Sequence, residues 1–139
     1  MIPARKSTSY FVIHCSATRP SMNVGVKDIR RWHMEKGWQD IGYHFVIKRD
    51  GTVETGRGVT LVGAHEPTRN ANSVGICLVG GVNEKDYTKA ENNYTPEQWV
   101  ALEKLVKKLL VTYPKVKIMG HRDCPKVHKA CPSFDAIAW

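Results

Sequence analysis

The amino-acid sequence predicts an α/β fold, with a central mixed β-sheet flanked by helices. Short apolar runs of strand length alternate along the chain with two segments whose apolar residues recur at helical spacing. The chain has 139 residues, about the length of one domain, and its 42% hydrophobic and 24% charged residues are typical of a globular protein rather than a disordered one. We therefore expect a single domain that spans residues 1–139.

Five short apolar segments predict the strands. Each is rich in β-branched or aromatic residues and is bounded by polar, glycine or proline residues; in order they are residues 10–14, 43–48, 52–55, 73–79 and 116–119. Asp50-Gly51 lies between the second and third segments and favours a tight hairpin turn. The first and last segments would carry His14 and His121 at their carboxyl ends.

Two segments predict helices. In residues 26–36 the apolar positions recur at helical spacing, and Gly37 is a suitable helix stop. Residues 95–98, Thr-Pro-Glu-Gln, combine a capping threonine, a proline at the first helical position and a glutamine that can reach back to the cap. The apolar residues that follow fall on one helical face with lysines opposite them, and Pro114 comes where this helix should end.

Charge and hydropathy narrow the function classes. Lys and Arg number 21 against 13 Asp and Glu, which gives a net charge of +8. Such a charge attracts polyanions such as nucleic acid, anionic lipid or cell-envelope polymers, although a dispersed solvated face is equally compatible with it. No apolar run approaches the roughly 18 residues of a membrane span, and no apolar signal-peptide core follows the basic N-terminus. Nothing in the sequence indicates more than a monomer.

Two strand-end histidines and one cysteine form a candidate metal site. Cys131 follows His121 by ten residues, and His14 ends another strand that can lie beside it. Two imidazoles and one thiolate make a three-ligand Zn²⁺ set with a fourth position open for water, which would ionise near pH 7 and become available for hydrolysis. The alternative for each histidine is an ordinary structural role.

A second arrangement of metal ligands is conceivable in the same tail. His121, Cys124, His128 and Cys131 follow one another at short spacing and could enclose a structural zinc ion with no open position. Together with the positive charge, that arrangement would indicate a nucleic-acid-binding protein. It lacks the long segment that separates the ligand pairs of zinc fingers, so we prefer the open three-ligand site.

Several blocks of sequence together resemble a known enzyme family. In chain order they are His14-Cys-Ser-Ala-Thr, Asn23-Val-Gly-Val, Ile29-Arg-Arg-Trp-His, Gly37-Trp, Gly42-Tyr-His-Phe, Ile47-Lys-Arg-Asp-Gly-Thr-Val-Glu, Asn72-Ser-Val-Gly-Ile-Cys-Leu-Val-Gly-Gly and Lys129-Ala-Cys-Pro-Ser-Phe. They are similar to the zinc amidases, or endolysins, of T-seven-type coliphages. Those enzymes are type 2 N-acetylmuramoyl-L-alanine amidases and share the fold of the peptidoglycan recognition proteins. The resemblance covers most of the chain and is weakest over residues 1–8 and 82–93.

The resemblance implies an enzyme that cleaves the amide bond between N-acetylmuramic acid and L-alanine in peptidoglycan. It implies one Zn²⁺ per chain, bound by His14, His121 and Cys131, and it places Tyr43 and Lys129 at the two catalytic positions beside the metal. A phenol and an ammonium there could stabilise the oxyanion of amide hydrolysis. Without the resemblance, Tyr43 would be interpreted as a core aromatic residue and Lys129 as a solvated charge.

The resemblance also suggests substrate-binding residues and partners. A histidine at the place of His65 lines the groove beside the metal in relatives, so His65 and nearby Asn72 are candidate substrate-binding residues. His33 and His44 are expected either to be packing residues or to support the metal ligands from behind. The enzyme would accumulate in the host cytoplasm and reach the wall on lysis or through a holin. The coliphage relatives also bind their phage's RNA polymerase, in part through the N-terminal region. Since the match is weakest there, this partner is left open.

The last loop departs from the phage pattern. His121-Arg-Asp is more similar to the bacterial branch of the fold, and the loop to Cys131 contains Cys124 and His128, either of which could compete for zinc. An alternative function is a non-catalytic module of the same fold that binds peptidoglycan without cutting it. Such modules usually lack the cysteine ligand, which this chain keeps as Cys131.

Overall fold

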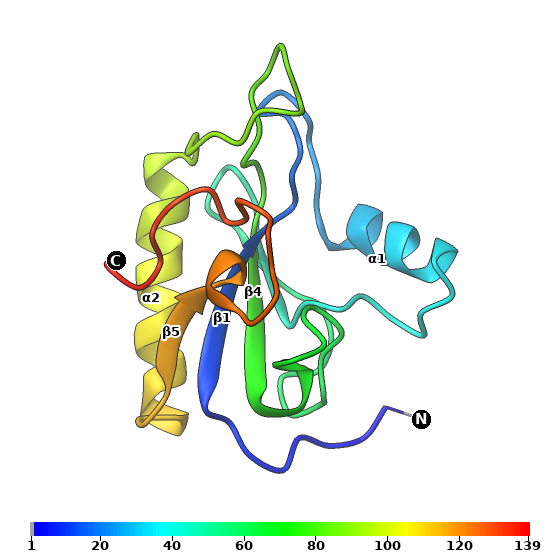
Figure 1. The fold of residues 1–139 in the computed structure, drawn as a ribbon, viewed down its shortest axis with the longest axis vertical. Helices are drawn as coiled ribbons and strands as arrows, with labels where there is room; N and C mark the ends of the chain where they lie inside the picture. Colours follow the sequence, from blue (N-terminus) through cyan, green and yellow to red (C-terminus); the bar gives the residue numbers. More distant parts are fainter. Residues whose placement is uncertain (1) are drawn as a thin grey trace.

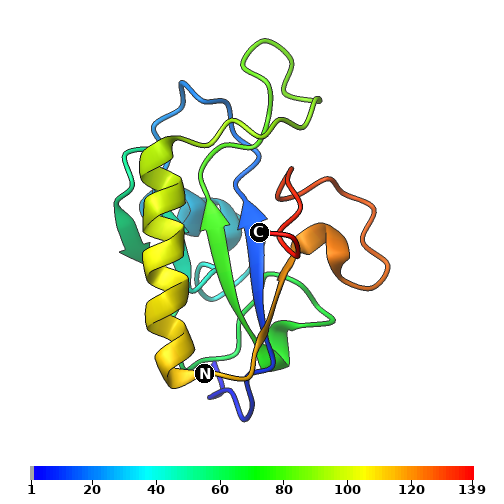
Figure 2. The ribbon, with the colours of Figure 1, turned by 90° about the vertical axis from the view of Figure 1, so that its left-hand side faces the viewer.

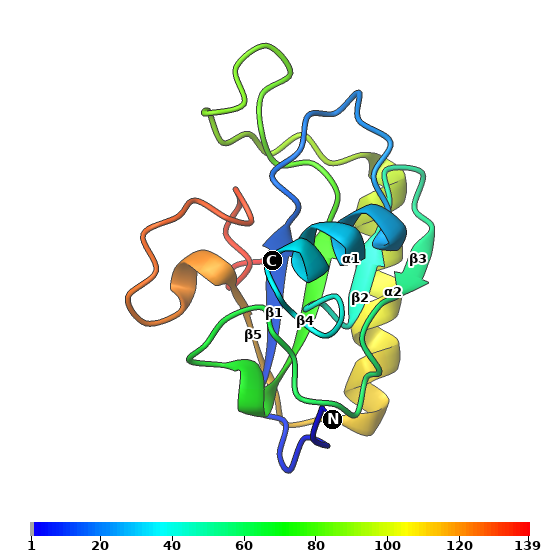
Figure 3. The same cartoon turned by 90° about the vertical axis from the view of Figure 1, so that its right-hand side faces the viewer.

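A computed structural model describes residues 2–139 and places a five-stranded sheet between two helices (Figure 1). The strands are β1 (Tyr10–Cys15), β2 (Phe45–Ile47), β3 (Val53–Thr55), β4 (Ser73–Leu78) and β5 (Lys117–Gly120). The helices are α1 (Val26–Glu35) and α2 (Pro96–Thr112), and two short 3₁₀ helices, η1 (Asn70–Asn72) and η2 (His121–Asp123), complete the set. Figure 3 shows α1 in front of the sheet and α2 behind it.

The sheet is mixed and has the order β3-β2-β4-β1-β5. β4 pairs in parallel with β1 and β2, β5 pairs in parallel with β1, and β3 alone runs antiparallel to its neighbour β2. The carboxyl ends of β1, β4 and β5 therefore lie at the same end of the sheet. In Figure 2 the segment after β5 folds back past the carboxyl end of β1.

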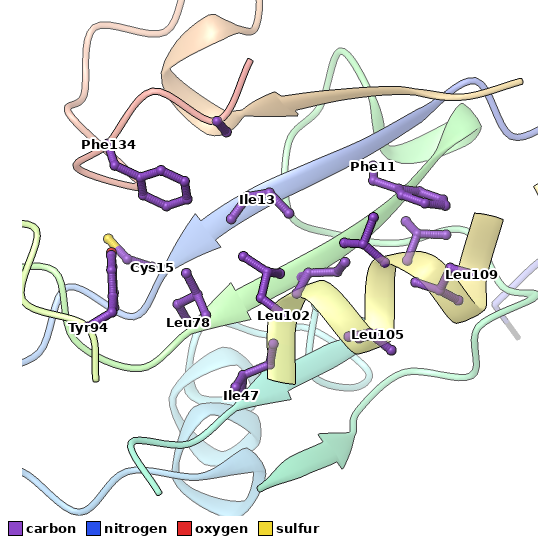
Figure 4. Packing of buried hydrophobic residues seen from close by; sticks show 14 residues of the cluster. Phe11, Ile13, Cys15, Ile47, Leu78, Tyr94, Leu102, Leu105, Leu109 and Phe134 are labelled. Carbon is purple, nitrogen blue, oxygen red and sulfur yellow. The ribbon is translucent and has the colours of Figure 1, made fainter. Parts of the chain in front are cut away.

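The two faces of the sheet bury different sets of side chains, because successive residues of a strand point to opposite faces. Phe11 and Ile13 of β1 pack with Leu102 and Leu105 of α2 in the larger core (Figure 4). The smaller core joins residues of α1 to β2 and β4; its buried members are Val24, Val26, Ile29, Ile41, Val46, Cys77 and Val79. His14 alternates with Ile13 and lies on the α1 face.

Local sequence signals explain the ends of the helices. Gln98 donates its backbone N–H to Thr95 Oγ1 (3.1 Å), and Thr95 donates its own to Gln98 Oε1 (2.9 Å). The buried Gln98 side chain also donates to the carbonyls of Ile47 (3.1 Å) and Val79 (2.9 Å), which ties the start of α2 to β2 and to the end of β4. Gly37 follows α1 with φ of +90°, the left-handed conformation that glycine adopts readily.

The predicted fold class, a mixed sheet flanked by helices, is confirmed. Each predicted strand and helix is present with its ends shifted by at most a few residues, and residues 50–51 form the expected turn between β2 and β3. Neither helix of residues 2–139 has the length and apolar character that crossing a membrane requires.

Candidate metal centre

Three potential metal ligands converge at the carboxyl end of β1. One ligand atom each from His14, His121 and Cys131 lie within 4.8 Å of one another, the one such group within residues 2–139. Ile13 pairs with Gly120 across β1 and β5, so the residues that follow lie side by side, and the rings of His14 and His121 have centroids 4.5 Å apart. The metal ligands predicted from the sequence thus come together.

Two backbone N–H groups, from β1 and from η2, hold the third ligand, Cys131, in place. The backbone N–H of Cys15 donates to Cys131 Sγ (3.1 Å), and the backbone N–H of Arg122 donates to the carbonyl of Cys131 (2.7 Å). A hydrogen bond with Cys15 and burial raise the pKa of the Cys131 thiol. Loss of its proton on metal binding must therefore be driven by the cation, as in other thiolate sites.

Both histidines of the centre are held in the neutral form that binds metals. His14 is 1% exposed, and burial together with the charges of His65, His121 and Lys129 lowers its pKa well below the usual value. Burial also lowers the pKa of His121, although Glu66 opposes the shift. At neutral pH the centre offers two uncharged imidazoles.

The donor set fits zinc. Imidazole nitrogen and thiolate sulfur are preferred Zn²⁺ ligands, and three protein ligands are typical of catalytic sites, in which a fourth position stays open. Zinc bonds of about 2.0–2.1 Å to nitrogen and 2.3 Å to sulfur place tetrahedral ligands about 3.5 Å apart. The three ligand atoms lie within 4.8 Å of one another, so a modest inward rotation of the side chains would bring them to this spacing.

Tyr43 lies beside His14 of the ligand cluster. Its ring packs against the rings of His14 (5.0 Å between centroids) and His33 (5.4 Å). Burial raises the pKa of Tyr43 well above its usual value, so the phenol keeps its proton and can donate a hydrogen bond. Lys129, the other predicted catalytic residue, is exposed and lies two residues before Cys131 in the same loop.

The two candidate substrate-binding residues differ in their relation to the centre. His65 Nδ1 lies 2.8 Å from His14 Nε2, and Ser73 Oγ lies 3.1 Å from His65 Nε2. Asn72 ends η1 and accepts the backbone N–H of Ser9 at its carbonyl (2.8 Å). Its Oδ1 is buried and has no hydrogen-bond partner among residues 2–139, so hydrogen bonds link His65, and not Asn72, to the centre.

The closed four-ligand site does not form. Cys124 is buried, and its Sγ contacts the carbonyl of Gly120 (3.8 Å) and Met119 Sδ (3.9 Å) rather than the ligand cluster. His128 is exposed. Neither residue belongs to the ligand cluster, because η2 carries the chain away from it after His121 and turns Cys124 back against the end of β5.

His33 and His44 bind backbone groups. His33 Nδ1 accepts the backbone N–H of Gly42 (2.8 Å). His44 is completely buried; its Nδ1 accepts the N–H of Gly75 (3.0 Å) and its Nε2 donates to the carbonyl of Leu61 (2.8 Å). Both ring nitrogens of His44 are therefore occupied by backbone groups.

One residue near the centre was missed by the sequence analysis. Glu66 is 5% exposed, and its Oε1 lies 3.6 Å from His121 Nε2. The only signal that could have indicated it is its place directly after His65 in the sequence.

Comparisons with known proteins find a matching family model and similar proteins over nearly the whole chain. A family model described as N-acetylmuramoyl-L-alanine amidase matches residues 4–134. The endolysin of Enterobacteria phage K11 is 53% identical over 135 residues, which cover 97% of this chain and 87% of the relative.

Two solved structures share the fold. The N-acetylmuramoyl-L-alanine amidase LysC from Clostridium intestinale has a TM-score of 0.78 and 31% identity, covering 93% of this chain and 78% of that one. A point mutant of Drosophila PGRP-LB in complex with tracheal cytotoxin has a TM-score of 0.81 and 28% identity, covering 99% of this chain and 83% of that one.

Proposed function

The chain belongs to the N-acetylmuramoyl-L-alanine amidase family and is a peptidoglycan-cleaving amidase of the endolysin type; from this premise we propose that it works through one zinc ion bound by His14, His121 and Cys131. The observation that carries the proposal is the convergence of these three ligand atoms within 4.8 Å at the carboxyl end of β1. Bound there, zinc would act as a Lewis acid that activates a water molecule and polarises the carbonyl of the scissile amide.

Tyr43 and Lys129 are the proposed catalytic residues. Amide hydrolysis passes through a tetrahedral oxyanion, which is stabilised by hydrogen-bond donors and positive charge placed in advance. Tyr43 packs against His14 and stays protonated because burial raises its pKa. Lys129 brings an ammonium group to the same loop as Cys131. Burial is the main cause of the lowered pKa of both histidine ligands, and the charge of Lys129 is a smaller cause in the same direction.

The substrate is proposed to be cell-wall peptidoglycan cut at the bond between N-acetylmuramic acid and L-alanine. The structural relative PGRP-LB binds tracheal cytotoxin, which supports recognition of a muropeptide by this fold. His65 is proposed to line the substrate groove next to His14. Asn72 is the weakest member of the proposed set, because its Oδ1 is buried.

Delivery to the wall is proposed to follow the endolysin pattern, with accumulation in the host cytoplasm and release on lysis or through a holin. The net charge of +8 would concentrate the enzyme on an anionic envelope, an attraction that salt screens. The comparisons give no support to RNA polymerase as a partner, and it is not part of the proposal.

Digestion of purified peptidoglycan tests both the bond and the metal. We expect new L-alanine amino termini without new reducing sugar ends, loss of this release after treatment with a chelator, and its return when zinc is added. New reducing ends would show that the glycan is cut instead. Full release by protein shown to contain no metal would contradict the zinc proposal.

A further inference from the structure

We propose that Glu66 is a positioning residue for the metal ligand His121, and that it holds the imidazole so that Nδ1, not Nε2, faces the metal. The inference rests on the proposed zinc function. Glu66 Oε1 lies 3.6 Å from His121 Nε2, and both side chains are largely buried, with 7% and 14% of their surface exposed. This is the one contact within 4.0 Å between a carboxylate oxygen and a nitrogen of a proposed histidine ligand within residues 2–139.

The carboxylate is fixed by a turn that leaves one oxygen free for His121. Glu66 Oε2 accepts the backbone N–H of Thr68 (2.7 Å) and also its hydroxyl. Asn70 Oδ1 accepts the backbone N–H groups of both His65 and Glu66, each at 2.8 Å. Burying a carboxylate is costly unless it is hydrogen-bonded. Here the hydrogen bonds from Thr68 to Oε2 offset the cost of burial, and Oε1 faces His121 of the metal centre.

Two consecutive residues of this turn meet the two histidine ligands. His65 Nδ1 lies 2.8 Å from His14 Nε2, and Glu66 Oε1 faces His121 Nε2. With both Nε2 atoms engaged, the Nδ1 atoms of the two ligands remain for the metal. Metal-binding histidines commonly donate their other ring N–H to a carboxylate, a carbonyl or water, which fixes the tautomer and the ring orientation.

The distance of 3.6 Å is longer than a direct hydrogen bond, which ends near 3.2 Å. A small rotation of either side chain, or one bridging water, completes the interaction between Nε2–H and the carboxylate. In both cases the negative charge increases the basicity of the imidazole as a ligand. Loss of such a partner typically weakens metal affinity by about 10- to 100-fold.

The test measures zinc affinity, by competition with a chromophoric chelator, for the wild type, Glu66→Gln and Thr68→Val. Glu103→Gln is the matched control, since Glu103 is exposed on α2 and pairs with Lys107 alone. We expect Glu66→Gln to weaken zinc binding by about tenfold or more, Thr68→Val to weaken it less, and the control to match the wild type. The visible absorption of cobalt-substituted Glu66→Gln should also differ from that of the wild type, because the ligand field changes.

Two other outcomes would overturn the inference in different ways. If Glu66→Gln lowers the melting temperature of the metal-free protein but keeps wild-type zinc affinity and cobalt absorption, Glu66 only stabilises the turn, while the proposed function stands. If the wild type itself binds no zinc, the proposed function fails and the role of Glu66 fails with it.

Discussion

Two pairs of histidines in this fold have different partners. His14 and His121 meet side chains at one nitrogen, through His65 and Glu66, and share a cluster with Cys131. His33 and His44 instead bind backbone groups of Gly42, Gly75 and Leu61. Both ring nitrogens of His44 are occupied by backbone groups, so it has none to offer a metal, and His33 binds the N–H of Gly42 outside the ligand cluster. All four histidines have lowered pKa values through burial, so their partners and not their burial distinguish the two pairs.

Removal of the thiolate should have the largest effect, because it takes away one of three ligands. Cys131→Ser is expected to lose most of its zinc and nearly all amidase activity. Cys124→Ser is the matched control, since Cys124 is a buried thiol outside the cluster. Metal content by atomic emission and release of muropeptides, measured on the same samples, check the prediction. Equal loss of zinc in both variants would contradict the three-ligand site and support the closed four-ligand site.

Tyr43→Phe should separate catalysis from metal binding. The substitution keeps the ring that packs against His14 but removes the phenol, so we expect zinc to stay and the rate to fall by about 10²–10³. Tyr87→Phe, at an exposed position, should keep wild-type activity. A rate within a few-fold of the wild type would exclude Tyr43 as the donor to the oxyanion.

Acid should destabilise the protein through its structural histidines. Burial lowers the pKa of His44 to about 4, whereas the unfolded chain keeps the ordinary value of 6.5. Between these values the unfolded state binds more protons, so stability present above pH 6.5 is lost as the pH falls toward 4, by up to about 3 kcal/mol. Protonation would also place a hydrogen on Nδ1 of His44, which would then face the backbone N–H of Gly75 as a second donor and break that hydrogen bond.

Urea unfolding of the metal-free protein between pH 7 and pH 4 measures this loss. We expect the decline to be shallower in His44→Leu, which is also less stable throughout, and unchanged in His128→Ala, since His128 is exposed. A decline as steep in His44→Leu as in the wild type would assign it to other groups.

The smallest effect is expected far from both histidine pairs. Thr95→Ala removes the hydroxyl that caps α2 and should cost about 1 kcal/mol of stability. Amidase activity should not change. Denaturant midpoints of Thr95→Ala and of Thr112→Ala, at the exposed end of the helix, check the assignment; similar midpoints for the two variants would show that the cap contributes little.

The sequence predicted those features that depend on local patterns. The apolar runs of β1 and β4, the cap at Thr95 and the stop at Gly37 each depend on a few consecutive residues. The ligand trio was predicted because strand ends in a parallel sheet converge, and the family resemblance supported it.

The missed features depend on contacts between distant segments. Glu66 faces His121 only because a turn around Asn70 orients it, and no local pattern encodes that contact. Cys124 turns away from the centre because η2 follows β5 directly. The partners of His44 come from segments 17 and 31 residues away.

Anomalous diffraction at the zinc absorption edge, on crystals of the zinc-loaded protein, tests the central claim most directly. The account predicts one zinc peak per chain, bonded to His14, His121 and Cys131 at about 2.0–2.3 Å, with no fourth protein ligand. A peak bonded to Cys124 or His128, or one enclosed by four protein side chains, would contradict it.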